Sequence, residues 1–384
     1  MRRNWSRSQF AACGPRALHV KSADDDNSLI NRACLFSQSF PTLAVMEHEG
    51  NQALKTRHRH ADREVTTRDG TGLAVRVYGS RAARRTVVLL HGLCVSDEVW
   101  SVQVGYLLGR HGEDIRVITY DHRGHGRSSR AAAQTYRIAQ LASDLEDVLA
   151  ALDVVGPITL VGHSMGGMAA LAYLARSSAD RTADPDGLVL VTTAAGKLAQ
   201  RGLGRSLAAP GIFALLADVD RIPTRALELI AGPVCSALAR IWPAQQTMLK
   251  NIAKAAAGTS VPTVIGFLPT LREFELHGTL HRIRAKTVIV SAGADPVLPV
   301  AHSHDLADAI PGAVHLHLPQ SGHMVLKETP NAINEAIEYA MFPCGTEQLA
   351  ARSDEGGTLA GLVNQIDFER LSTRNTFDKS RMGA

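Results

Sequence analysis

Residues 158–167 read ITLVGHSMGG and join a short apolar run to a glycine-rich turn. The run Ile158–Val161 predicts a buried strand, and the apolar residues of Met165–Ala175 predict a helix. Between them, Ser164 stands in the pattern Gly-x-Ser-x-Gly, which in a strand–turn–helix context is typical of a nucleophilic serine on a strained turn. We therefore expect the Ser164 hydroxyl to be exposed at the carboxyl edge of a sheet, above a helix N-terminus that favours a developing oxyanion.

Strand-like and helix-like segments alternate on both sides of this turn. Strands are predicted at Glu64–Thr67, Leu73–Tyr78, Thr86–Leu90, Ile115–Tyr120, Ile158–Val161, Leu188–Thr192, Thr287–Ser291 and Ala313–Leu318. Amphipathic or apolar stretches predict helices at about Val99–Arg110, Ala139–Leu152, Met165–Ala175 and Pro330–Met341. The first two strands flank an Asp69–Gly72 turn and read as a hairpin. This alternation predicts an α/β fold, with a mostly parallel central sheet and helices on both faces.

The alternation stops between residues 199 and 283, where helical patches replace strands. They lie at Gly211–Asp218, Thr224–Ile241, Ala244–Ala257 and about Pro262–Phe274. Because this segment separates two predicted sheet strands, we expect it to project from the sheet edge as an inserted, all-helical cap. The core is then formed by residues 63–198 and 284–342. Residues 1–62 and 343–384 lack periodicity and are expected to be a disordered extension and a polar tail.

The composition is that of an ordinary globular protein, with 384 residues, 45% of them hydrophobic, and a formal net charge of +4. Residues 1–63 hold ten Lys/Arg and six Asp/Glu, so the remaining 321 residues, with 31 of each sign, are neutral. A neutral body argues against nucleic-acid binding. No apolar run is long enough for a transmembrane helix. The five cysteines lack CxxC spacing and are expected to be free thiols, which favours a cytoplasmic location.

A serine nucleophile needs a base and an orienting carboxylate. His323 follows the last predicted strand, in Ser321-Gly-His-Met324, and is the expected base. Asp295 follows the preceding strand, at the beginning of Asp-Pro-Val, and is the expected carboxylate. The order Ser…Asp…His is the one that this sheet topology requires. His315 and His317 alternate within the last strand and are expected to face solvent or a helix.

A tetrahedral oxyanion needs two N–H donors, and only backbone is required. The residue after the nucleophile, Met165, is expected to supply one. The loop after Thr86–Leu90, which reads His91-Gly-Leu-Cys94, is expected to supply the other from the Leu93 N–H. His91 is expected to brace this loop, and Cys94 to be a packing residue.

Together these motifs make the chain resemble the α/β-hydrolase fold superfamily over about residues 64–342. The matching blocks are His91-Gly92, Asp121-His-Arg-Gly-His-Gly-Arg-Ser128, Gly162–Gly167, Asp295 and His323, all in the expected order. The resemblance implies the fold, a Ser-Asp-His triad and a helical cap, and it implies that the 121–128 block is a structural loop. It does not imply a substrate.

A serine at the nucleophile position excludes some of the reactions that this superfamily catalyses. Relatives that open epoxides or displace halide use a carboxylate at the elbow, and the epoxide-opening ones have tyrosines in the cap, whereas residues 199–283 contain none. We therefore expect a carboxylesterase or lipase-like serine hydrolase, acting through an acyl-enzyme on an ester with an apolar acyl chain. A C–C bond hydrolase, a haloperoxidase-like perhydrolase and a non-catalytic ligand-binding protein remain alternatives. No cofactor and no metal are expected. The expected partner is a small-molecule ester, and peripheral membrane contact and the oligomeric state stay open.

Overall fold

The structure, a computed structural model, describes residues 59–202 and 259–342. Its eight strands form one sheet in the order β1-β2-β4-β3-β5-β6-β7-β8. β2 pairs antiparallel with both of its neighbours, and all other pairs are parallel. The predicted fold class, an α/β fold with a mostly parallel sheet, is confirmed. Most of the expected cap and of both terminal segments lies outside the described residues.

The strands and helices fall close to their predicted positions. The strands are β1 His60–Thr66, β2 Gly72–Tyr78, β3 Arg85–Leu90, β4 Ile115–Tyr120, β5 Ile158–His163, β6 Gly187–Val191, β7 Lys286–Ala292 and β8 Val314–Leu318. The α-helices are α2 Ser101–His111, α3 Ile138–Ala151, α4 Met165–Ala175, α9 Val261–Glu273, α10 Ala301–Ala309, α11 Val325–Glu328 and α12 Pro330–Met341. Helix α9 confirms the last helical patch predicted for residues 199–283. Among the described residues, no helix is long and apolar enough to cross a bilayer.

Three details differ from the prediction, and the first is that the short helix α11 was not predicted. Strand β1 begins at His60, before the predicted start of order at Arg63, because His60 pairs with Tyr78 of β2 at the sheet edge. Its side chains are mostly exposed, so no apolar alternation marks it. Helix α10, Ala301–Ala309, was not predicted, since Leu306 is its only large apolar residue.

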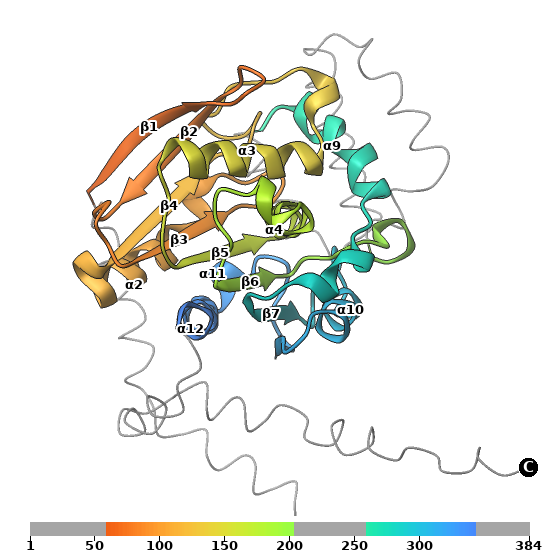
Figure 1. The fold of residues 1–384 in the computed structure, drawn as a ribbon. Helices are drawn as coiled ribbons and strands as arrows, with labels where there is room; N and C mark the ends of the chain where they lie inside the picture. Colours follow the sequence, from red (N-terminus) through yellow and green to blue (C-terminus); the bar gives the residue numbers. More distant parts are fainter. Residues whose placement is uncertain (1–58, 203–258, 343–384) are drawn as a thin grey trace, which may run out of the picture. The chain divides into compact units, whose positions relative to one another are not determined.

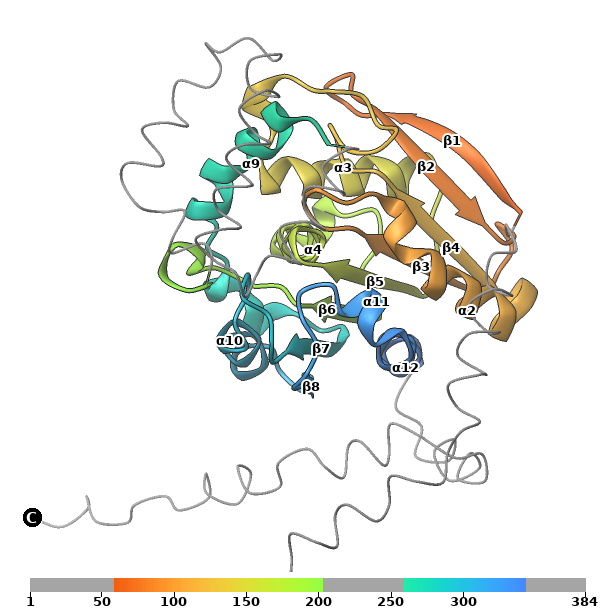
Figure 2. The same ribbon diagram turned by 180° about the vertical axis from the view of Figure 1, so that it is seen from behind.

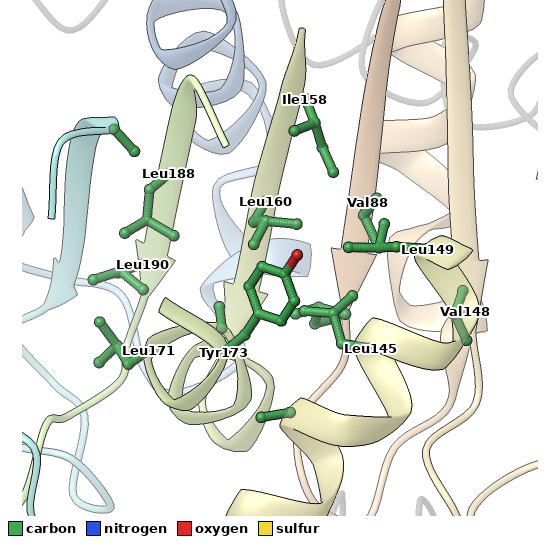
Figure 3. Close-up of a cluster of buried hydrophobic side chains, with 14 of the residues drawn as sticks. Val88, Leu145, Val148, Leu149, Ile158, Leu160, Leu171, Tyr173, Leu188 and Leu190 are labelled. Carbon is green, nitrogen blue, oxygen red and sulfur yellow. The ribbon is translucent and has the colours of Figure 1, made fainter. Parts of the chain in front are cut away.

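Helices cover both faces of the sheet (Figures 1 and 2). Helices α3 and α4 pack on one face, with α10 beside them, and α2 and α12 pack on the other. Figure 3 shows the first of these layers, in which Leu145 and Leu149 of α3 and Tyr173 of α4 meet Leu160 and Val88 of the central strands. Because β3 and β6 are buried on both faces, their apolar residues are continuous along the strand rather than alternating.

The order of the strands fixes where a site can form. From β3 the chain runs to β4 on one side, and β5 then lies on the other side of β3. At such a switch point the loops after the two strands diverge and leave a crevice at the carboxyl edge of the sheet. Leu90 at the end of β3 pairs with Gly162 at the end of β5. The loop after Leu90 and the turn at Ser164 therefore lie side by side.

A buried arginine connects the loop after β4 to its surroundings. Arg123 is 0% exposed and donates to both carboxylate oxygens of Asp144 in α3, over 2.8 and 2.6 Å. It also donates to both oxygens of Asp69 in the β1–β2 turn, over 2.7 and 3.2 Å. One guanidinium thus joins the 121–128 loop, a helix and the hairpin. This agrees with the structural role that the resemblance implies for this block.

We predict that Arg123→Ala lowers the free energy of unfolding by about 3–5 kcal/mol, because it leaves the buried Asp144 carboxylate without its partner. Urea unfolding monitored by circular dichroism measures this. The matched control is Arg81→Ala, which breaks the exposed Arg81–Asp153 ion pair and should cost less than about 1 kcal/mol. Equal losses in the two variants would contradict the structural role of Arg123.

Candidate active site

Ser164 occupies a strained turn between β5 and α4. Its φ is 53° and its ψ is −118°, a backbone conformation that residues other than glycine rarely adopt. The turn is held on both sides, since the Ser164 N–H donates to the Val191 carbonyl of β6 over 2.9 Å. Its own carbonyl accepts from the Thr193 hydroxyl over 2.7 Å. The predicted strain at the turn is confirmed, and strand β6 and the loop after it supply the hydrogen bonds that maintain it.

The glycines around Ser164 allow three pieces of backbone to approach closely. A Cβ on Gly162 would lie 2.5 Å from the Gly167 Cα, so the strand and the helix could not meet at this angle. A Cβ on Gly166 would collide with the Leu90 carbonyl oxygen of β3. Both glycines are therefore required at these positions, and their effect is to press the turn against the loop that follows β3.

The structure brings Ser164, His323 and Asp295 together as predicted. His323 Nε2 lies 3.1 Å from Ser164 Oγ, and His323 Nδ1 lies 2.7 Å from Asp295 Oδ2. Since a carboxylate only accepts, Nδ1 carries the proton and Nε2 is left to accept from the serine hydroxyl. This is the tautomer that a general base needs.

The Asp295 carboxylate is held by its own loop. Its Oδ1 accepts hydrogen bonds from the N–H groups of Val297 and Leu298, over 2.8 and 3.0 Å. Oδ2 is therefore the oxygen that turns toward His323. The loops carrying the two residues are joined by the Ala294 N–H, which donates to the Ser321 carbonyl over 2.9 Å. Asp295 thus holds its own loop with one carboxylate oxygen and contacts His323 with the other.

The loop after β3 touches the turn at Ser164. A Cβ on Gly92 would lie 3.2 Å from the Ser164 Cβ, so the segment that contains Leu93 passes directly beside the serine. Met165, the other expected donor, is the first residue of α4, where N–H groups have no partner within the helix. With Gly92 and His323 against it, Ser164 is only 9% exposed. The sequence predicted an exposed Ser164 hydroxyl, whereas in the structure the residue is largely buried.

Three buried histidines support this loop. His91 Nδ1 donates to the Gly92 carbonyl over 2.7 Å, and His91 Nε2 accepts from the His122 N–H over 2.9 Å. In turn, His122 Nε2 donates a hydrogen bond to the His91 carbonyl over 3.0 Å. His125 packs beside the His91 ring, 5.3 Å between centroids. The bracing role expected for His91 is confirmed, and the structure adds two further rings to it.

The remaining predicted residues behave as expected, and one was missed. His315 and His317 contact the Ser291 hydroxyl on β7, both over 2.8 Å, and the His315 ring faces His304 of α10. Cys94 is buried, as expected of a packing residue. The residue missed is His163, which precedes the serine and contacts His323. Its position inside the Gly-x-Ser-x-Gly pattern was the only signal, and that pattern accepts any residue there.

The buried histidines should make the protein less stable in mild acid. Burial lowers the pKa of His125 and of His163 to about 3, and lowers those of His91 and His122 as well. The unfolded chain, with histidine pKa values of about 6.5, then binds more protons below that pH. The free energy of unfolding should therefore fall between pH 6.5 and 5, by up to about 1.4 kcal/mol per pH unit for each buried histidine.

Urea unfolding at several pH values measures this slope, and His125→Phe provides the comparison. The variant keeps a flat ring against His91 and cannot take up a proton, so its slope between pH 6.5 and 5 should be shallower. A wild-type stability that does not change over this interval would contradict the prediction.

Comparisons with known proteins agree with the geometry. A sequence model of the alpha/beta hydrolase fold matches residues 85–330. A putative carbamate hydrolase, RutD, from Caulobacter sp. (strain K31) is 32% identical over 282 residues, which are 69% of this chain and 94% of that protein. A non-heme chloroperoxidase from Streptomyces lividans is 37% identical over 119 residues, covering 31% of this chain and 41% of that protein.

Solved structures show the same relationship. The esterase RhEst1 from Rhodococcus sp. ECU1013 is 26% identical and matches with a TM-score of 0.55, covering 74% of this chain and 99% of that one. The family match spans more than half of the chain and includes the turn at Ser164, the Asp295 loop and the His323 loop. The chain is therefore a member of the alpha/beta hydrolase fold family.

Proposed function

We propose that the protein is a serine hydrolase that cleaves a carboxylic ester through an acyl-enzyme, with Ser164 as nucleophile, His323 as base and Asp295 as orienting carboxylate. The observation that carries this proposal is the continuous chain of hydrogen bonds from Ser164 Oγ through the His323 ring to Asp295. A structural serine needs no such chain, whereas a nucleophilic serine needs a base with its free nitrogen toward the hydroxyl.

The reaction follows from this geometry. His323 Nε2 takes the proton as Ser164 Oγ attacks the ester carbonyl, and the resulting oxyanion accepts hydrogen bonds from the Leu93 and Met165 N–H groups. When the tetrahedral intermediate collapses, the C–O bond of the ester breaks and the alcohol leaves with the proton from Nε2. Water then repeats the sequence on the acyl-enzyme and releases the acid. Asp295 stabilises the charged imidazole in both halves.

Apolar side chains next to the serine favour an apolar acyl group. Met165 and Leu298 belong to one buried cluster with Phe267 of α9, and Leu93 and Val297 pack against it from partly exposed positions. This cluster lies beside the nucleophile, the proposed oxyanion donors and the Asp295 loop. An alkyl chain that leaves water against the partly exposed Leu93 and Val297 would be stabilised by about 0.8 kcal/mol per methylene. The name of the related esterase agrees with ester cleavage.

Two other acyl transfers use the same groups, and the names of relatives favour each of them. RutD of Caulobacter is named a putative carbamate hydrolase, and a carbamate carbonyl can be attacked by the same serine. The Streptomyces relative is named a chloroperoxidase, and an acyl-enzyme attacked by hydrogen peroxide instead of water gives a peracid. Substituting carbamates for esters, or adding hydrogen peroxide to the ester assay, distinguishes these reactions from simple hydrolysis.

We predict that Ser164→Ala lowers kcat for a p-nitrophenyl ester by on the order of 10⁶-fold, since only binding and the oxyanion donors remain. The control is Ser291→Ala, which removes a buried hydroxyl bonded to two histidines outside this site and should retain wild-type activity. A Ser164→Ala protein that keeps a tenth of the wild-type rate would contradict the assignment of Ser164 as nucleophile. A wild-type protein that is as inactive as Ser164→Ala would favour the non-catalytic alternative.

The chain-length profile tests the acyl group. We predict that kcat/KM rises about fourfold per added methylene from acetyl upward, until the apolar surface is filled. Phe267→Ala should shift the optimum, because Phe267 shares the cluster with Met165. Leu280→Ala, a buried truncation in a different cluster, should lower stability and leave the profile unchanged. A wild-type profile that is flat or best on acetyl would contradict the apolar acyl chain.

A further inference from the structure

His163 lies between the proposed nucleophile and the loop that carries the proposed base. It is the last residue of β5, directly before Ser164, and it is 1% exposed. Its Nε2 donates to the backbone carbonyl of His323 over 2.9 Å. The two imidazole rings also pack against each other, with 5.1 Å between their centroids and 46° between their planes. His163 thus contacts both the backbone and the ring of His323.

The opposite edge of the His163 ring faces the loop after β3. A Cβ on Gly92 would lie 2.9 Å from His163 Nδ1, so the ring fills the space that the glycine leaves. One side chain therefore contacts three parts of the site, namely the turn at Ser164, the Gly92–Leu93 backbone and the His323 loop. Any displacement of this ring would change the spacing between them.

The His163 ring is held in one tautomer and stays uncharged. Because the His323 carbonyl can only accept, the proton of His163 must be on Nε2, and Nδ1 has no hydrogen-bond partner in the described part of the chain. Burial, together with the neighbouring His323, lowers the pKa of His163 to about 3. His163 therefore stays neutral when His323 takes the serine proton, and the two rings never carry charge together.

A second donor approaches the same carbonyl. The hydroxyl of Thr192, the residue directly after β6, lies 3.5 Å from the His323 carbonyl oxygen. This contact is at the limit of hydrogen-bond distance, so the 2.9 Å bond from His163 is the stronger of the two. The backbone of His323 is thus attached to the central strands mainly through a side chain adjacent to the nucleophile.

We propose that His163 is a positioning residue, which sets the distance and orientation of His323 toward Ser164 by holding the His323 carbonyl and packing against its ring. This inference rests on the proposed function for its kinetic consequence. Its structural content, that His163 fixes the His323 imidazole against Asp295, can be measured separately.

Three substitutions separate the hydrogen bond from the volume of the ring. His163→Gln carries an amide N–H at the same number of bonds from Cβ as His Nε2, so it can reach the His323 carbonyl. His163→Asn carries the same amide one bond short. His163→Phe keeps a ring and has no donor. The stability control is Tyr173→Phe, which removes a buried 2.7 Å hydrogen bond to the Ala183 carbonyl in the body of the protein.

With a p-nitrophenyl ester, we expect His163→Asn and His163→Phe to lower kcat by about 10–100-fold, the order of loss that a small misplacement of a reacting group causes. KM should stay within about twofold, since no substrate contact is removed. His163→Gln should recover most of kcat. Tyr173→Phe should lower the melting temperature and leave kcat unchanged. If His163→Asn and His163→Gln lose activity equally, or neither loses any, the positioning role is overturned.

A readout independent of turnover is the proton resonance of His323 Nδ1–H, which a hydrogen bond to Asp295 shifts downfield in NMR spectra. We expect this resonance in the wild type and in His163→Gln, and expect it shifted or lost through exchange in His163→Asn. If the wild type cleaves no acyl substrate but the resonance responds in this way, the proposed function fails and the positioning inference stands. An unchanged resonance in His163→Asn would overturn the inference.

Discussion

The site depends on one constraint, the backbone conformation of Ser164. A φ of 53° with a ψ of −118° reverses the chain within one residue, so that β5 ends and α4 begins at the serine. Such a turn is unfavourable by itself. It is maintained because Gly162 and Gly166 allow backbone contacts that a side chain would forbid, and because the Ser164 N–H and carbonyl are both bonded to the neighbouring strand and loop.

The other parts of the site are positioned relative to this turn by the sheet. Parallel pairing of β3 with β5 places the Gly92–Leu93 backbone beside the serine, and pairing of β6, β7 and β8 in order delivers the Asp295 and His323 loops to the same edge. The hydrogen bonds among the three side chains then select one tautomer of His323. Buried histidines on both sides of the serine, His91 and His163, hold the adjoining loops without adding charge, because burial keeps their pKa values low.

Much of this arrangement could be predicted from the sequence because its elements carry strong local signals. The central strands are continuous apolar runs, α4 and α12 were predicted at their observed bounds, and the three candidate site residues each follow a predicted strand. Elements that form because of tertiary contacts were harder to predict from the sequence. Strand β1 is an exposed edge strand, so no apolar pattern in the sequence marks where it begins. Helix α10 has little apolar periodicity, so the sequence did not indicate a helix there. His163 was missed because its role comes from a contact with His323, 160 positions away along the chain.

The proposed function depends above all on Ser164 being an activated nucleophile. The most direct test is the intact mass of the full chain after incubation with a fluorophosphonate, followed by peptide mapping, because phosphonylation requires a base that removes the serine proton. We predict a single adduct, located on the peptide that contains Ser164, and no adduct on the Ser164→Ala or His323→Ala protein. Wild-type protein that stays unmodified, or an adduct on a different serine, would contradict it.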